Sequence, residues 1–341
     1  MLTIDDVKKY DVSNMFDVIM KTHSQIEDSL SIIKDFNPKA VSYSNIIICG
    51  MGGSAIGGDF VLNILKDEAG IPIFVNRGYE IPNWVNKSTL VVLCSYSGNT
   101  EETISCYNYS KKITKHLLII SSGGYLLEEA LKNDIDYIRL ISGIQPRAAF
   151  GYSSSLLLLA LEKLNITNNS YNNILENTAK SLKTMSSELS KINNKNKALI
   201  MAKNIYNKFI IIYGTSITET VCLRFRGQLA ENSKILSMHN VLPELNHNEI
   251  EAFLNLKNSL IVWIEDSNDN IQNKNRIKFT SKLLNHIEGQ IFCSQNGDHV
   301  LERLYKNILF LDWVSFYASI FNKIDPTPVN NIMKLKKMLS R

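Results

Sequence analysis

Residues 90–103 read LVVLCSYSGNTEET. The first four residues are apolar, as expected of a buried strand, and three hydroxyl side chains then surround a glycine: Ser95, Ser97 and Thr100. Two glutamates follow at once, where acidic residues favour the first turn of a helix. A single hydroxyl or amide side chain would be enough to cap that helix. Three hydroxyls at a helix N-terminus therefore raise a second possibility, a cradle for a phosphate.

The same order of apolar run, polar turn and amphipathic segment recurs on both sides of this stretch. Other short apolar runs lie at 46–49, 71–75 and 117–120, and a helix is expected over about 54–66. Strands that alternate with helices predict a parallel, doubly wound α/β sheet. The turns that follow its strands would then share one edge of the sheet, where ligands of such folds bind.

The second half of the chain repeats the pattern after a helical interval. An apolar helix is expected at 153–164, followed by a polar stretch with helical spacing. Strand-like runs then return at 209–214, 234–238, 259–264 and 290–293. The run at 209–214 ends in glycine like the run at 46–50, which is a weak internal repeat. We therefore expect four segments: an N-terminal helical segment at 1–40 with a helix over about 14–35, an α/β domain at 41–152, a helical connection at 153–205, and a second α/β domain with a C-terminal helical tail at 206–341.

The glycine-rich turn after the first strand allows two interpretations. Residues 48–60 read ICGMGGSAIGGDF, and Gly50, Gly52 and Ala55 satisfy the G-x-G-x-x-A pattern of dinucleotide-binding folds. That pattern expects an acid at the end of the next strand, where this chain has Arg77, a residue that could suit a 2′-phosphate. In the other interpretation, the backbone at Gly53 and the hydroxyl of Ser54 approach an anion closely.

Composition excludes several classes of protein. The 341 residues are 45% hydrophobic and 21% charged with a net charge of +4 and no basic stripe, so we expect no nucleic-acid partner. No apolar run reaches the length of a membrane span, and the N-terminus lacks the features of a signal peptide. The five cysteines form no CxxC pair, which favours buried thiols in a reducing compartment, the cytoplasm. We find no cluster of histidines and acids at metal-ligand spacing, and expect neither metal nor cofactor.

Six motifs, in this order, resemble those of the bifunctional phosphoglucose/phosphomannose isomerases: GMGGSAIGGD, SYSGNTEET, GIQPRAAFGY, GQLAENSK, PELNHNEIEAF and DPTPV…LK. The resemblance runs from about residue 40 to the C-terminus. It implies two SIS (sugar isomerase) domains of the doubly wound type with flanking helices, a homodimer with a shared active site, and interconversion of glucose 6-phosphate and mannose 6-phosphate with fructose 6-phosphate.

The resemblance also implies roles for individual residues. The phosphate would be held by the glycine-rich turn and the hydroxyl cluster, that is by Gly53, Ser54, Ser95, Ser97 and Thr100. Arg147 would lie by C1 and C2 of the sugar, and Glu231 would transfer the proton. His247 would come from the partner subunit and assist ring opening. The tail lysine would be Lys336, although Lys334 and Lys337 lie close by, and Thr327 would leave room for rotation about C2–C3.

The chemistry suits these residue types. An enediolate path needs a carboxylate that takes and returns one proton, a permanent cation beside the enediolate oxygens, and an acid near neutrality for the ring oxygen. A non-catalytic SIS protein that senses phosphosugars is the alternative. Such a sensor would not need Glu231, His247 and Arg147 together.

Overall fold

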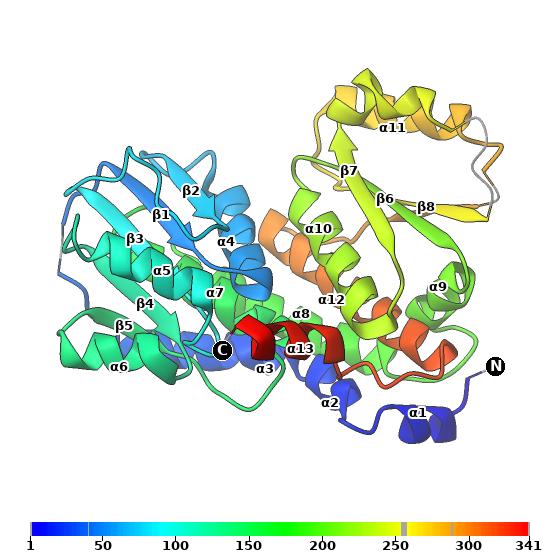
Figure 1. Ribbon diagram of the computed structural model, residues 1–341. Helices are drawn as coiled ribbons and strands as arrows, with labels where there is room; N and C mark the ends of the chain where they lie inside the picture. The colour runs from blue at the N-terminus through cyan, green and yellow to red at the C-terminus, as the bar shows by residue number, and fades with distance from the viewer. Residues whose placement is uncertain (1, 40, 254–257, 288, 340–341) are drawn as a thin grey trace. The chain divides into compact units, whose positions relative to one another are not determined.

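The computed structural model describes residues 2–39, 41–253, 258–287 and 289–339. The chain forms two compact units. One, the five-stranded unit, is Lys21–Lys183; the other, the four-stranded unit, combines Met1–Met20 with Thr184–Arg341. Each unit has its own parallel sheet, as Figure 1 shows.

The five-stranded sheet has the order β2-β1-β3-β4-β5 and every pairing is parallel. Its strands are β1 (Asn45–Cys49), β2 (Ile73–Asn76), β3 (Thr89–Cys94), β4 (Leu117–Ser121) and β5 (Asp136–Arg139). The first four confirm the strands expected from the apolar runs. The edge strand β5 was not expected, because its sequence DYIR contains two charged residues and no apolar run, and only Ile138 is buried.

Helices cover both faces of this sheet. Side chains alternate between the faces along each strand, and the face that includes Ile47, Val91 and Ile119 packs on α5 (Glu101–Ser110) and α6 (Gly124–Lys132). On the opposite face α4 (Gly52–Leu65) approaches closely, since a Cβ added to Gly58 would lie 3.1 Å from the side chain of Ile48. Behind α4 lie α7 (Phe150–Lys163) and then α3 (Thr22–Ile32). The expected doubly wound α/β architecture is confirmed.

The four-stranded sheet has the order β7-β6-β8-β9 and is also parallel throughout. Its strands are β6 (Phe209–Thr215), β7 (Ser237–Leu242), β8 (Ser259–Ile264) and β9 (Gln290–Cys293). One face packs on α11 (Ile271–Leu283). The remaining helices of this region are α9 (Lys197–Ile205), α10 (Glu219–Gln228), the 22-residue α12 (Val300–Phe321) and the tail helix α13 (Asn330–Leu339).

The two sheets repeat one another in topology. In each, the first strand of the unit lies between the second and third, so β7-β6-β8-β9 corresponds to β2-β1-β3-β4. The weak repeat noted between the two glycine-terminated runs therefore reflects two sheets of the same design. Helix α8 (Asn172–Leu189) carries the chain from the first unit into the second.

Two expectations differ from the structure. The helix expected over about 14–35 is divided at Lys21 into α2 (Met15–Met20) and α3, because α2 packs on α12 and α3 packs on α7. A further short helix, α1 (Ile4–Tyr10), precedes them. The strand expected at 234–238 begins only at Ser237, because Lys234 has a left-handed backbone that ends a helical segment. In the part of the chain that the structure describes, no helix has the length and apolar character of a membrane span.

Candidate active site

The glycine-rich turn and the hydroxyl turn lie side by side at one edge of the five-stranded sheet. Strands β1 and β3 are neighbours, with Cys49 opposite Leu93. Both strands end here, and a Cβ added to Gly50 would lie 3.0 Å from the carbonyl oxygen of Cys94. The two turns therefore face the same carboxyl edge of the sheet, as the sequence predicted.

Two of the three hydroxyls in the second turn contact each other, and none of the described side chains caps α5. The hydroxyls of Ser95 and Thr100 lie 2.8 Å apart, and Ser95 is only 1% exposed. Thr100 is the residue before α5, yet it makes no capping bond to that helix. Asn99, the other candidate cap, instead accepts a hydrogen bond from the backbone N–H of Tyr125 at 2.9 Å. The hydroxyl of Ser97 is exposed and accepts a 3.3 Å bond from the N–H of Asn99. Simple capping thus does not explain the three hydroxyls.

The backbone of the hydroxyl turn is fixed from behind. Gly98 has a left-handed φ of 69°, and a Cβ there would lie 1.8 Å from the carbonyl oxygen of Gly123. The carbonyl of Gly98 accepts a bond from the N–H of Leu126 at 3.1 Å, and that of Tyr96 accepts one from Ser122 at 3.0 Å. Only glycine fits at position 98, and the turn is therefore pre-shaped.

Arg147 lies beside the glycine-rich turn. It is in a short 3-10 helix (Pro146–Ala148) and is 5% exposed. A Cβ added to Gly53 would lie 3.0 Å from the carbonyl oxygen of Pro146 and 3.4 Å from Cα of Arg147. Ser54, half-buried, follows in the first turn of α4. The five-stranded unit thus brings the predicted phosphate residues and the predicted arginine to one place.

Arg77, which kept the dinucleotide interpretation open, is engaged elsewhere. Its guanidinium forms an ion pair with Asp59 of α4. Burial raises the pKa of Asp59, and the arginine opposes that rise. A ribose 2′-phosphate at this strand end would have to displace a carboxylate that Arg77 already holds.

Glu231 lies on a turn of π-helix, Leu229–Ser233, at the end of α10. Single π turns inside α-helices are frequent at functional sites. The next two residues, Asn232 and Ser233, are fully buried and bond to α12. The side-chain amide of Asn232 donates to the hydroxyl of Ser315 at 3.0 Å, and the hydroxyl of Ser233 donates to the carbonyl of Ser315 at 2.6 Å. Glu231 itself is half-buried. Its neighbours are fixed, while Glu231 itself remains partly exposed.

A buried ion pair supports the same turn from the preceding helix. The guanidinium of Arg224 donates to both carboxylate oxygens of Asp312, at 3.2 and 2.6 Å, and neither side chain is more than 7% exposed. The amide of Gln228 donates to the same carboxylate at 3.0 Å. Breaking a buried pair by removing one partner is strongly destabilising. The Arg224–Asp312 pair therefore fixes the position of α10 along α12, next to the turn that carries Glu231. These contacts could not be predicted from local sequence, because the partners lie more than 80 positions apart.

The remaining predicted residues belong to the four-stranded unit; His247 and Lys336 are exposed, whereas Thr327 is half-buried. His247 is exposed at the end of a 3-10 helix, Glu244–His247. Thr327 follows α12 in the tail, where its N–H donates to Asp325 at 2.9 Å. Lys336 is exposed on α13.

The pattern of α13 distinguishes between the tail lysines. None of the described side chains of this helix is buried, although it carries several large apolar residues. Ile332, Leu335 and Leu339 have the spacing of one helical face, and Lys336, four residues after Ile332, lies on that face. Lys334 is two residues from Ile332 and points away from it. Any contact made by this apolar face would therefore also involve Lys336.

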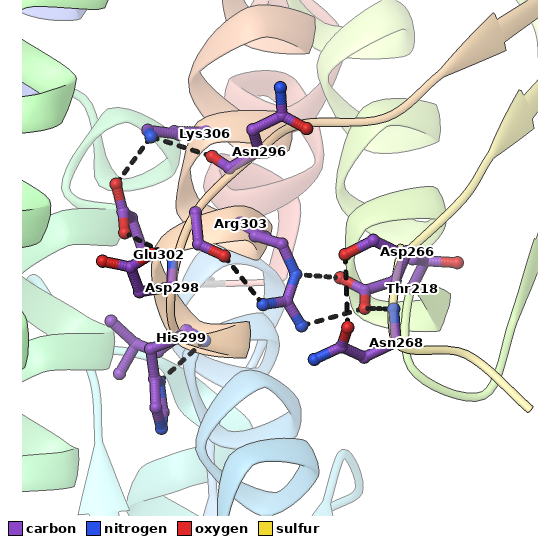
Figure 2. Close-up of polar contacts among 12 residues, drawn as sticks. Thr218, Asp266, Asn268, Asn296, Asp298, His299, Glu302, Arg303 and Lys306 are labelled. Atoms are coloured by element: carbon purple, nitrogen blue, oxygen red, sulfur yellow. Dashed lines mark hydrogen bonds and ion pairs between the residues drawn. The ribbon is translucent and has the colours of Figure 1, made fainter.

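The corresponding edge of the four-stranded sheet is occupied by the chain's own charges (Figure 2). After β8, Asp266 receives two hydrogen bonds from Arg303 of α12, at 2.9 and 3.0 Å, and both side chains are buried. The loop between β8 and α11 reads EDSNDN where the loop after β3 reads SYSGNT. Burial and Asp269 raise the pKa of Glu265. Among the residues described, no three His, Cys, Asp or Glu side chains gather as they would around a metal ion.

Comparison with known proteins identifies the family. A family model described as the bacterial phospho-glucose isomerase C-terminal SIS domain matches residues 194–339. A bifunctional phosphoglucose/phosphomannose isomerase of Caldicellulosiruptor bescii is 37% identical over 336 residues, 96% of this chain and 99% of the relative. The chain belongs to the bifunctional phosphoglucose/phosphomannose isomerase family.

Other similarities agree with this family assignment. A member from Aquifex aeolicus is 31% identical over 337 residues, which cover 97% of this chain and 99% of that protein. Among solved structures, the C-terminal domain of glucosamine-fructose-6-phosphate aminotransferase from Francisella tularensis superposes with a TM-score of 0.72. At 16% identity, covering 92% of this chain and 98% of that one, it is evidence of the fold alone. The expected SIS-type architecture is confirmed.

Proposed function

We propose that the chain is an aldose–ketose isomerase that interconverts glucose 6-phosphate and mannose 6-phosphate with fructose 6-phosphate. Family membership supports the reaction. The observation that supports its location is the grouping of Gly53, the Ser95–Thr100 hydroxyl pair and Arg147 at one sheet edge. A phosphate offers acceptor oxygens to these hydroxyls, and the start of α5 adds backbone N–H groups and a favourable dipole.

In this proposal Glu231 removes the proton from C2 of the open-chain aldose and returns it to C1 of the enediolate. The same carboxylate therefore ends the cycle as it began. A half-buried carboxylate on a fixed turn suits this task, because proton transfer needs a base within hydrogen-bond reach in a defined orientation.

Arg147 would hold the two enediolate oxygens as negative charge develops on them. A guanidinium remains charged at any working pH, and a charge already in place needs no reorganisation during the reaction. The 5% exposure of Arg147 reduces screening by water. Reprotonation on either face of C2 after rotation about C2–C3 would give glucose or mannose 6-phosphate, with Thr327 leaving room for that rotation.

We further propose a homodimer in which the partner's copy of His247 protonates the ring oxygen. Its exposure at the end of a 3-10 helix supports delivery to another subunit. Lys336 would reach the site when the apolar face of α13 docks. The five cysteines, all free and all buried, support a reducing compartment, and we place the protein in the cytoplasm.

The test is a coupled assay of fructose 6-phosphate formation from each aldose phosphate, in the presence of EDTA. Turnover of both substrates is expected. Glu231→Gln should then lower kcat by about 10²–10⁴-fold but still bind glucitol 6-phosphate, which has no carbonyl and cannot react. Glu251→Gln, an exposed acid of the same unit, is the matched control and should keep full activity. Phosphosugar binding without turnover of either substrate by the wild type would favour the sensor alternative.

A further inference from the structure

Lys234 has an unusual backbone for its residue type. It follows the π turn of Glu231 directly and adopts the left-handed conformation, with φ 59° and ψ 34°. Residues with a Cβ rarely occupy this region, and glycine or asparagine is the usual choice at a helix end. What distinguishes Lys234 from other residues with this backbone is what its side chain contacts.

Lys234 is an exposed residue whose ammonium contacts three backbone carbonyls. Its Nζ donates to the carbonyl oxygen of Glu231 at 2.5 Å and to that of Pro328 at 2.8 Å, with that of Pro326 at 3.4 Å. An ammonium group has three donors. One contact is with the residue proposed as the base, and the other two are with a tail segment more than 90 positions away.

Both ends of this connection are places where side chains commonly bond the backbone. The carbonyl of Glu231 lies in the last turn of a helical segment, where side chains often donate to carbonyls. The segment Pro326-Thr327-Pro328 has a single backbone N–H, that of Thr327, and Asp325 already accepts it. Prolines donate no hydrogen bond, so this segment is held mainly through its carbonyls.

A second contact fixes the π turn to the end of α12. The amide of Asn322, just after α12, donates to the carbonyl of Ser233 at 2.8 Å. The π turn is thus fixed to α12 and its exit, and Lys234 extends that fixation to the proline segment.

We propose that Lys234 is a positioning residue, whose ammonium ties the backbone of Glu231 to the Pro326–Pro328 segment and thereby holds the carboxylate in the geometry for proton transfer. This inference rests on the proposed role of Glu231 as the base. It is separate from substrate binding, so the loss of Lys234 should lower kcat with little effect on KM.

The experiment compares Lys234→Gly with Lys323→Gly. Lys323 is a matched control, because it is a lysine of the same region with the same left-handed backbone, φ 58°. Glycine suits that conformation in both variants, so neither substitution strains the backbone. Because a displacement of an ångström can slow a reaction about 100-fold, we expect Lys234→Gly to reduce kcat by about tenfold with KM unchanged within about twofold. Lys323→Gly should resemble the wild type.

Two further substitutions separate the ammonium from the bulk of the side chain. Lys234→Arg keeps a charged donor and should recover part of kcat, whereas Lys234→Met keeps the length without donors and should not. Hydrogen exchange supplies a readout that needs no activity: segments 229–235 and 325–329 should exchange faster in Lys234→Gly than in the control. Wild-type kcat in Lys234→Gly would overturn the proposal. If the wild type turns over neither aldose phosphate, the proposed function fails, and exchange alone decides whether Lys234 ties the two segments together.

Discussion

Because the hydroxyls of Ser95 and Thr100 bond to each other, substitutions at these two residues should change folding stability and phosphate affinity in different ways. Thr100→Val keeps the shape of the side chain but leaves the hydroxyl of Ser95, 1% exposed, without its 2.8 Å partner. An unsatisfied buried group costs about 1–3 kcal/mol of folding stability. For a unit of this size that corresponds to roughly 2–4 °C in melting temperature for each kcal/mol.

Adding Ser95→Ala should recover stability. With both hydroxyls gone no buried polar group is left unsatisfied, and replacing both partners by apolar groups of similar shape can be nearly neutral. The double variant should therefore melt closer to the wild type than Thr100→Val does. Affinity should behave in the opposite way, because each hydroxyl lost removes a hydrogen bond to a charged phosphate, worth about 1.5–3 kcal/mol. That is about ten- to 150-fold in Kd for one hydroxyl, and more for two.

The assay combines thermal unfolding with calorimetric titration of glucitol 6-phosphate. Ser97→Ala is the control, since its hydroxyl is exposed and its loss should change stability by less than about 0.5 kcal/mol while still weakening binding. Stability losses that add in the double variant would mean that Thr100 acts as an independent helix cap. An unchanged Kd in all three variants would refute the phosphate cradle.

Three other predictions follow from the structure. Gly98→Ala would place a Cβ 1.8 Å from the carbonyl oxygen of Gly123 in a left-handed backbone, so the five-stranded unit should lose its cooperative melting transition; a calorimetric scan at wild-type sharpness would contradict this. Burial, with Arg226 adding to it, lowers the pKa of His239 in the folded protein, so the unfolded chain binds the proton more readily and stability should fall as the pH drops below about 6.5. His239→Gln should flatten that decline in urea unfolding from pH 7 to 5, and an equal slope in both proteins would exclude His239 as its source. Lys336→Ala should lower kcat/KM in the coupled assay whereas Lys334→Ala should not, and the reverse order would show that the apolar face of α13 does not dock at the site.

Strands that form a continuous apolar run were predictable from the sequence, and β5, which does not, was missed. The runs that became β1, β3, β4, β6 and β8 are almost wholly buried, so composition alone identifies them. Strand β5 has one buried residue, Ile138, and its sequence DYIR carries no such signal. At Lys234 the local sequence reads as the start of a strand, but the contacts that end the π turn come from the proline segment more than 90 positions away.

The candidate site shows the same division between local and distant information. The hydroxyls and glycines of the two turns are visible because each turn is one continuous motif. The buried support of Glu231 through Asp312 and Ser315 is not visible, since a serine or aspartate inside a long apolar helix gives no indication of its partner. The motif alone does not decide between Lys336 and Lys334. Helical spacing does separate them, because only Lys336 lies four residues after Ile332.

The matching order of the two sheets suggests that a duplication gave this chain two equivalent sheet edges, which have since diverged. One edge has small and hydroxylated residues. At the other, the buried Asp266–Arg303 pair places two opposite charges of the chain itself. This difference agrees with the proposed roles, in which the first edge holds the phosphate and the later half of the chain supplies Glu231. A protein with two similar halves can in this way be asymmetric in chemistry while remaining nearly symmetric in backbone.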